Sequence, residues 1–436
     1  MAATAARTAA LDTMSAVRAG SLADRAFDEA ARGLDARDRA WAQELVYGTL
    51  RLRNRLDHHL AAHSSRRIDE LDPDTLDILR LGAYQLLEMH SVPAYAAVSE
   101  SVELAKARAR RSAGFVNAVL QSLRRAPAAS TFSTPEQDPV AYLTTWGSHP
   151  RWLVERWLRR FGHAAARRLV ELNNTRPELY VRALGDDPAE AIGLLERANL
   201  EVEPVPLLAR AYRITGGTAA AAVAAAPVIV QDPAAGLVVD YIGPVPDRIV
   251  DLAAAPGGKA VGLACDRPSA GRIIGAADIS YSRLDRLREN VDRLGSCARS
   301  ILPVVADGRK PPFREVDLVL LDAPCTGTGT FRRHPDARWR LEPDDLEVLG
   351  SLQAELLAAA ASLVRPGGLL VYATCSLEPE ENEVQVRKFL AEHPDFAIEA
   401  GSGIDAALVD ADGMLRVLPH EHGFDGSFAA RLRRSA

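Results

Sequence analysis

The second half of the chain, from about residue 235 onward, alternates short apolar runs with longer helical stretches. Short apolar runs bounded by turn residues are typical of buried parallel strands. Their alternation with helices predicts βαβ units and a Rossmann-like, mostly parallel sheet. We expect strands at 249–252, 273–276, 301–305, 318–321 and 369–372, and helices at 281–294 and 345–363. Two last apolar runs, 414–418 and 428–432, predict an antiparallel pair that closes the sheet.

The first part of the chain has a different pattern. At 436 residues the chain is too long for one compact core. Residues 5–126 show only helical spacing of apolar side chains, and a polar, proline-containing linker follows at 126–135. Residues 140–230 look mixed, with a helix at 152–168 and a strand at 179–184; the alanine-rich run 218–226 fits helix or loop. The sequence therefore predicts three regions, an all-α one at 1–130, a small α/β one at 140–234 and an α/β one at 235–436.

Composition narrows the class of protein. The chain is 47% hydrophobic and 25% charged, as globular proteins are, and has no apolar run long enough for a membrane span. Its beginning lacks the apolar core of a secretory signal, and four cysteines without a CxxC pair indicate neither a disulfide framework nor a zinc site. We expect a cytoplasmic protein without a metal, not associated with a membrane. Nothing in the sequence requires more than a monomer.

Charge gives mixed indications about a nucleic-acid partner. The net charge of −6 argues mildly against one, but phosphate contacts depend on local patches. Residues 106–111 form one basic run, and Arg332, Arg333 and His334 begin another that continues to Arg338 and Arg340. Taken alone, each run fits a solvated face; the second lies just downstream of a cysteine at a strand end, which favours a functional role.

The expected strands end in residues suited to a cofactor pocket. Ligands bind at the carboxyl ends of strands in an open α/β sheet. The first strand runs into a glycine turn, where backbone can approach a ligand and the next helix offers free N–H groups to an anion. That turn is Ala253-Ala254-Ala255-Pro256-Gly257-Gly258-Lys259, preceded by Asp251-Leu252. It does not match G-x-G-x-x-G, which argues against a dinucleotide.

Three aspartates follow the next strands in order. Asp278 is placed to accept hydrogen bonds from ribose hydroxyls, Asp307 to meet an adenine edge, and Asp322 ends the fourth strand. An acid for ribose, one anion site and no pyrophosphate signature suit S-adenosylmethionine. The plainer interpretation is a generic α/β fold with ordinary aspartates at strand ends; the order of the elements favours the cofactor.

Cys325 and Cys375 each follow an expected strand, next to Asp322. Thiolate addition at C6 of cytosine makes C5 nucleophilic enough to accept a methyl group, and a base must then remove the C5 proton. A carboxyl group beside the thiol would supply a proton or a hydrogen-bond donor to N3 of the base. A free cysteine titrates near about 8.5, so the thiolate needs nearby positive charge, for which Arg332 and Arg333 are candidates. The alternative is that all four cysteines are core residues. We expect that for Cys265 and Cys297, not for Cys325 and Cys375.

These motifs resemble the signatures of the RNA 5-methylcytosine methyltransferases. The matching residues are 254–259, Asp322-Ala323-Pro324-Cys325 with 326–329, and Ala373-Thr374-Cys375-Ser376. Residues 331–336 with Trp339, and 378–383, are similar to the bacterial ribosomal branch. Independently, residues 78–87, 103–106 and 115–120 resemble the NusB fold, an all-helical RNA-binding module. A NusB-like region ahead of such a catalytic region resembles the Sun/RsmB family of small-subunit rRNA cytosine-C5 methyltransferases.

The resemblance implies roles that spacing does not decide. Spacing leaves either cysteine as the nucleophile; the family implies Cys375, with Cys325 assisting proton removal and product release. It also implies S-adenosylmethionine contacts from 253–259, Asp278, Asp307 and Asp322. The chain departs from the family pattern at Ala253, where cysteine is frequent, and at Gly426-Ser427-Phe428, where Gly-Phe-Phe is common. We regard both departures as matters of local packing.

The expected function is methyl transfer from S-adenosylmethionine to C5 of a cytosine in small-subunit (16S) rRNA, naked or partly assembled, through a cysteine–C6 adduct. Two alternatives stay open. The same chemistry on tRNA is one, because the NusB-like region indicates rRNA only by analogy. The other is a non-catalytic RNA-binding or ribosome-assembly factor with a relic pocket, which the retained cysteines, Asp322 and glycine turn disfavour.

Overall fold

The computed structural model describes residues 3–127, 131–266, 268–401 and 403–436. The chain forms two compact units. The short segment Phe331–Leu341 belongs to the helical unit, although the residues before and after it in the sequence belong to the α/β unit. The helical unit holds residues up to Arg176 together with Phe331–Leu341. The α/β unit holds Pro177–Thr330 and Glu342–Ala436.

The helical unit confirms the expectation of helices alone across the first part of the chain. Asp72 caps one of its helices by accepting from Thr75 N at 3.0 Å, and Pro73 occupies the first turn, where its missing N–H costs nothing. Leucines, valines and alanines on the inward faces form one continuous core. The helices are α1 (Ala5–Arg18), α2 (Ala23–Ala30), α3 (Ala36–Arg51), α4 (Arg53–His63), α5 (Pro73–Leu87), α6 (Ala94–Arg108), α7 (Ala113–Arg125), α8 (Pro139–Thr145), α9 (Arg151–Asn173) and α15 (Ala337–Arg340).

The segment Phe331–Leu341 is held firmly within the helical unit. Arg338 is fully buried there and donates to the backbone oxygens of Ser148, Asn173 and Phe331 at 3.1–3.2 Å. Trp339 Nε1 donates to Leu50 O at 2.6 Å. Arg338 is therefore a structural anchor, not part of a solvated basic face.

The α/β unit begins with a small four-stranded antiparallel sheet of order β2-β3-β1-β4. The strand expected at 179–184 is β1, and the undecided run 218–226 is a helix capped by Thr218, whose hydroxyl accepts from Ala221 N at 3.2 Å. The elements are β1 (Leu179–Ala183), α10 (Pro188–Arg197), β2 (Glu201–Pro204), β3 (Ala211–Gly216), α11 (Ala219–Ala225) and β4 (Val228–Val230).

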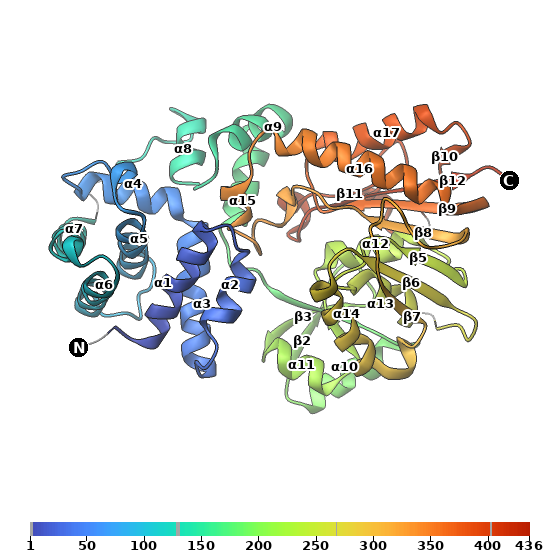
Figure 1. The fold of residues 1–436 in the computed structure, drawn as a ribbon, viewed down its shortest axis with the longest axis horizontal. Helices are drawn as coiled ribbons and strands as arrows, with labels where there is room; N and C mark the ends of the chain where they lie inside the picture. The colour runs from blue at the N-terminus through green and yellow to red at the C-terminus, as the bar shows by residue number, and fades with distance from the viewer. Residues whose placement is uncertain (1–2, 128–130, 267, 402) are drawn as a thin grey trace. The chain divides into compact units, whose positions relative to one another are not determined.

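The larger sheet has the order β10-β12-β9-β8-β5-β6-β7, with β11 paired to β12 (Figure 1). The five strands expected to be parallel are parallel. β11 pairs antiparallel with β12, which confirms the expected pair, and β12 joins it to β9, also antiparallel. The strands are β5 (Arg248–Asp251), β6 (Ile273–Asp278), β7 (Ile301–Val305), β8 (Val316–Asp322), β9 (Val364–Thr374), β10 (Phe396–Ile398), β11 (Leu415–Val417) and β12 (Ser427–Arg434).

Helices cover both faces of this sheet, because its central strands are apolar on both sides. One face packs against α12 (Pro233–Ile242), α13 (Gly258–Cys265) and α14 (Tyr281–Leu294). The other packs against α16 (Asp345–Ser362) and α17 (Glu383–Glu392), and a short helix, α18 (Pro419–His422), precedes β12. The parallel strands end on the same edge of the sheet, which brings Asp251, Asp278, Asp322 and Thr374 to that edge.

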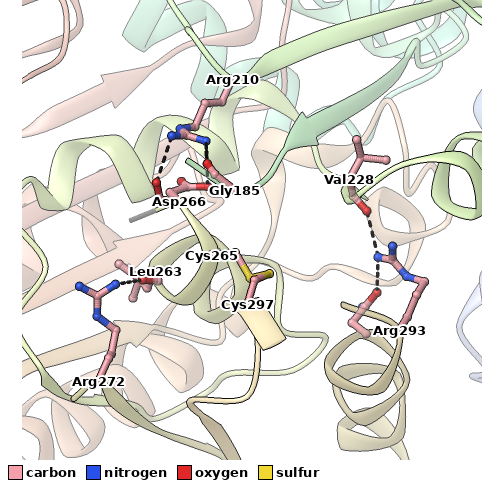
Figure 2. Close-up of a disulfide and its surroundings, with 10 residues drawn as sticks. Gly185, Arg210, Val228, Leu263, Cys265, Asp266, Arg272, Arg293 and Cys297 are labelled. Carbon is pink, nitrogen blue, oxygen red and sulfur yellow. Dashed lines mark hydrogen bonds and ion pairs between the residues drawn. A yellow bond between two sulfur atoms is a disulfide. The ribbon is translucent and has the colours of Figure 1, made fainter. Parts of the chain in front are cut away.

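Two cysteines expected to be ordinary core residues are joined to each other. Cys265 is the last residue of α13, and Cys297 closes the short turn after α14; they form a disulfide with Cα atoms 4.9 Å apart (Figure 2). The expectation for this pair was wrong, because the fold brings together two segments separated by 32 residues. The bond ties the end of α13, the helix that starts at the glycine turn, to the end of α14.

Candidate active site

Two thiols meet at the carboxyl edge of the large sheet. Cys325 follows β8 and Cys375 follows β9, and their Sγ atoms lie 3.4 Å apart. Both cysteines are free and half-buried. Adjacent parallel strands carry them, so the sheet itself sets their separation. The structure places Cys325, Cys375 and Asp322 together at this edge of the sheet.

The two thiols differ in acidity. The hydrogen bond from Cys325 lowers the pKa of Cys375, and Lys259 adds to that effect against burial, Asp322 and Asp425. The same hydrogen bond, together with burial and the charges of Cys375 and Glu381, raises the pKa of Cys325 well above its usual value. The arrangement therefore favours one thiolate, on Cys375, and one thiol, on Cys325.

Lys259 and Asp322 form an ion pair beside Cys375. Lys259 Nζ donates to Asp322 Oδ2 at 2.6 Å, and the attraction of Asp322 keeps the pKa of Lys259 raised although burial opposes it. The sequence pattern places Lys259 in the glycine turn and gives no sign of its closeness to the thiolate. Arg332 and Arg333, expected near the thiolate, belong to the helical unit, where Arg332 donates to Arg176 O at 2.8 Å.

The glycine turn has the shape expected of a ligand cradle. Gly257 has φ +100°, and a Cβ there would lie 2.2 Å from Leu287 Cδ1, so only glycine fits. Its neighbour Gly258 starts α13, and the bond between Ala255 and Pro256 is cis. Free N–H groups at the start of that helix are available to an anionic group.

Asp278 is tied to the glycine turn. It is 3% exposed, and its carboxylate accepts from Ala255 N at 3.2 Å and from Ser280 N at 2.9 Å. The next residue, Ile279, is 68% exposed, which leaves an apolar side chain on the surface directly after Asp278. Asp307 lies nearer the surface, and the hydrogen bond from Arg309 lowers its pKa to about 2.

Asp251 is a buried acid that sequence analysis left without a role. Burial raises its pKa to about 8, with Asp322 adding to the shift. Among the described residues, nothing forms a hydrogen bond with its Oδ1. A buried oxygen without a partner is open to a hydrogen bond from a bound ligand or water. The glycine turn, the Asp278 carboxylate and this oxygen together fit a ligand such as S-adenosylmethionine.

The described parts of the chain show neither a metal-binding cluster nor a membrane-spanning helix. No three His, Cys, Asp or Glu side chains gather there as a possible metal site. None of the helices described combines the length and the apolar character needed to cross a membrane.

The parallel sheet, the glycine turn and the strand-end acids define a Rossmann-like methyltransferase domain. The chain belongs to the 16S rRNA methyltransferase RsmB/F family, whose family model matches residues 243–433. Residues 4–125 match the NusB family, and residues 149–221 match the RsmF/B-like ferredoxin-like domain.

Relatives extend over nearly the whole chain. A probable ribosomal RNA small subunit methyltransferase B of Bacillus subtilis is 34% identical over 417 residues, covering 92% of each chain. A protein of the same description from Synechocystis sp. is 36% identical over 435 residues, covering 96% of each. Among solved structures, PH0851 superposes with a TM-score of 0.81 at 28% identity, over 99% of this chain and 98% of that one. The family and the fold class expected from the sequence are confirmed.

Proposed function

We propose that the protein transfers a methyl group from S-adenosylmethionine to C5 of a cytosine in small-subunit rRNA, through a covalent bond between Cys375 and C6. The observation that carries this proposal is the pair of Sγ atoms 3.4 Å apart beside the Lys259–Asp322 ion pair. C5 methylation needs a nucleophile and a separate base, and the two thiols have opposite pKa shifts. The names of the relatives supply rRNA as the substrate class.

The cofactor contacts are part of the same proposal. Residues 253–259 would surround the methionine part, and Asp278 would accept hydrogen bonds from the ribose, with Ile279 against the adenine. Asp307 and Asp322 complete the set, and Asp251 would offer its unpartnered Oδ1. When bound, the sulfonium of S-adenosylmethionine supplies the methyl group.

In the first step, the Cys375 thiolate adds to C6 of the cytosine. The electron pair of the C5–C6 double bond forms a C4–C5 double bond, the C4–N3 double-bond pair moves onto N3, and negative charge develops there. Lys259 and Asp322 lie beside the thiolate, and this pair would present a hydrogen-bond donor to N3. The target base has to leave its stack to reach a site at the edge of the sheet.

Once C5 carries the methyl group, the second step needs a base to remove the proton that remains on C5, and Cys325 is not a base in the resting site. The hydrogen bond to Cys375 is the largest of the causes that raise the pKa of Cys325. Once Cys375 is bonded to carbon, it carries no charge, and this part of the shift disappears. Ionisation of Cys325 is then easier, although burial and Glu381 still oppose it. Cys325 gives its proton to solvent and, as a thiolate, takes the proton from C5; the C5–C6 double bond re-forms and Cys375 leaves as a thiolate.

We further propose that residues 1–130 bind RNA structure, that 140–234 connect them to the catalytic region, and that 235–436 perform the chemistry in the cytoplasm, as a monomer. An RNA carrying fluorine at cytosine C5 tests the adduct, because it has no C5 proton to lose. We expect the wild-type protein to form a band of protein bound to RNA that withstands denaturation. A Cys375→Ala protein that still forms this band would contradict the proposal.

A further inference from the structure

A fully buried carboxylate lies behind the two cysteines. Glu381 ends the short 3₁₀ turn Pro379–Glu381 and has no exposed surface. Its Oε1 accepts from Thr326 N at 2.9 Å and from Gln353 Nε2 at 3.0 Å, and its Oε2 accepts from the Thr326 hydroxyl. Its backbone oxygen accepts from the Tyr372 hydroxyl at 2.6 Å. A buried carboxylate persists only with such partners, so its position is closely defined.

These contacts join the loops that carry the two thiols. Thr326 directly follows Cys325, and its hydroxyl lies 3.1 Å from the hydroxyl of Ser376, the residue after Cys375. Gln353 Nε2 also donates to Pro324 O, on the other side of Cys325, at 2.9 Å. Thr326 therefore bonds directly to the Glu381 carboxylate, and Ser376 is joined to that carboxylate through the Thr326 hydroxyl.

The charge of Glu381 acts on one thiol more than on the other. It raises the pKa of Cys325, in addition to the hydrogen bond with Cys375 and burial. The largest charge effects on Cys375 come instead from Asp322, Lys259 and Asp425. Burial raises the pKa of Glu381, and the hydrogen bonds to its carboxylate oppose that shift and favour the charged form. Negative charge on the Cys325 side opposes a thiolate there and so favours the thiolate on Cys375.

We propose that Glu381 is a positioning residue that clamps the two cysteine loops together and keeps the proton of the pair on Cys325. The nucleophile is then selected by a carboxylate that does not touch the substrate. This inference rests on the proposed function, because it explains why Cys375 and not Cys325 attacks.

Alkylation of the full-length protein with iodoacetamide tests the inference without any turnover. Mass spectrometry would give the rate at Cys325 and at Cys375 over a pH series. In the wild type we expect Cys375 to react at lower pH and Cys325 to follow at higher pH. Equal reactivity, or Cys325 reacting first, would overturn the proposal whatever the variants do.

Glu381→Gln removes the charge and keeps the size. We expect the ratio of Cys325 to Cys375 alkylation to rise about tenfold, which corresponds to one pKa unit. We also expect kcat for methyl transfer to fall while KM for S-adenosylmethionine stays unchanged. Glu381→Asp keeps the charge on a shorter side chain, so kcat should fall while the alkylation ratio stays as in the wild type.

Glu392→Gln is the matched control, since it removes the same charge from an exposed position at the end of α17. It should leave both readouts unchanged. A Glu381→Gln protein with the wild-type alkylation ratio would refute the inference. Turnover by Cys375→Ala would instead refute the proposed nucleophile, and the alkylation ratio would still decide the role of Glu381 separately.

Discussion

The Sγ atom of Cys325 lies 3.4 Å from that of Cys375, at the ends of two neighbouring parallel strands. The hydrogen bond between them lowers the pKa of one thiol and raises that of the other. A single contact therefore prepares a nucleophile and stores a proton on its neighbour.

Cys375→Ala should abolish methyl transfer, because no other thiolate is placed to attack C6. We expect kcat to fall by at least about 10⁴-fold, as it does when the nucleophile of other enzymes is removed. Binding of S-adenosylmethionine, measured by calorimetry, should stay close to that of the wild type. Methylated RNA at the normal rate would contradict the assignment.

Cys325→Ala should trap methylated RNA on the protein, since the C5 proton then has no base. A denaturing gel should show a protein–RNA band that carries the labelled methyl group. The variant also loses the hydrogen bond that lowers the pKa of Cys375, so alkylation of Cys375 should require a higher pH. Free product in normal yield, without a band, would count against the role of Cys325.

Asp278→Ala should weaken the binding of S-adenosylmethionine about 10- to 100-fold, on the order of 1–3 kcal/mol for a lost buried acceptor. The carboxylate would be missing both for the ribose and for Ala255 N in the glycine turn. RNA affinity should change little. Asp292→Ala, at an exposed position on α14, is the control. Equal titration curves for the two variants would remove the ribose assignment.

Asp251 should make stability depend on pH. Burial raises its pKa to about 8 in the folded protein, whereas an unfolded chain has an aspartate pKa of about 3.9. Between these values the folded state holds a proton that the unfolded state has lost, so stability should fall as pH rises. Asp251→Asn, which resembles the neutral acid, should lose this part of the dependence in urea unfolding. An identical pH slope in both proteins would contradict the assigned protonation.

Reduction of the Cys265–Cys297 disulfide should destabilise the α/β unit. The bond closes a loop with a sequence separation of 32 residues, for which chain entropy predicts about 3–4 kcal/mol. Denaturant unfolding with and without a reductant measures the effect, and Cys265→Ser with Cys297→Ser should reproduce the reduced protein. If unfolding of the protein with both serine substitutions still changed with the reductant, the loss of stability would not come from this disulfide.

The features that could be predicted from the sequence are those set by a short, local pattern of residues. The glycine turn, the strand-end aspartates and the positions of Cys325 and Cys375 follow from short apolar runs and the residues right after them. Prediction from the sequence failed where distant segments meet. Cys265 and Cys297 are brought together by the packing of two helix ends, and the second role of Lys259 depends on neighbouring strand order.

The same distinction applies to Glu381 and to the basic run after Cys325. The sequence shows Glu381 as one acid among several in 378–383; its burial and its bonds to Thr326 depend on how two loops fold against α16. Arg338 looks like part of a charged surface until the fold buries it. Long-range packing, which one sequence does not display, decides both cases.

The most direct test of the account is to incubate the protein with methyl-labelled S-adenosylmethionine and separate pools of small-subunit rRNA, small ribosomal subunits and tRNA, then digest the RNA and identify the labelled nucleoside. We predict label in 5-methylcytidine from the rRNA or the small subunits. Label in another nucleoside would contradict the two-thiol chemistry. Label in tRNA alone would contradict the ribosomal substrate and leave the mechanism standing.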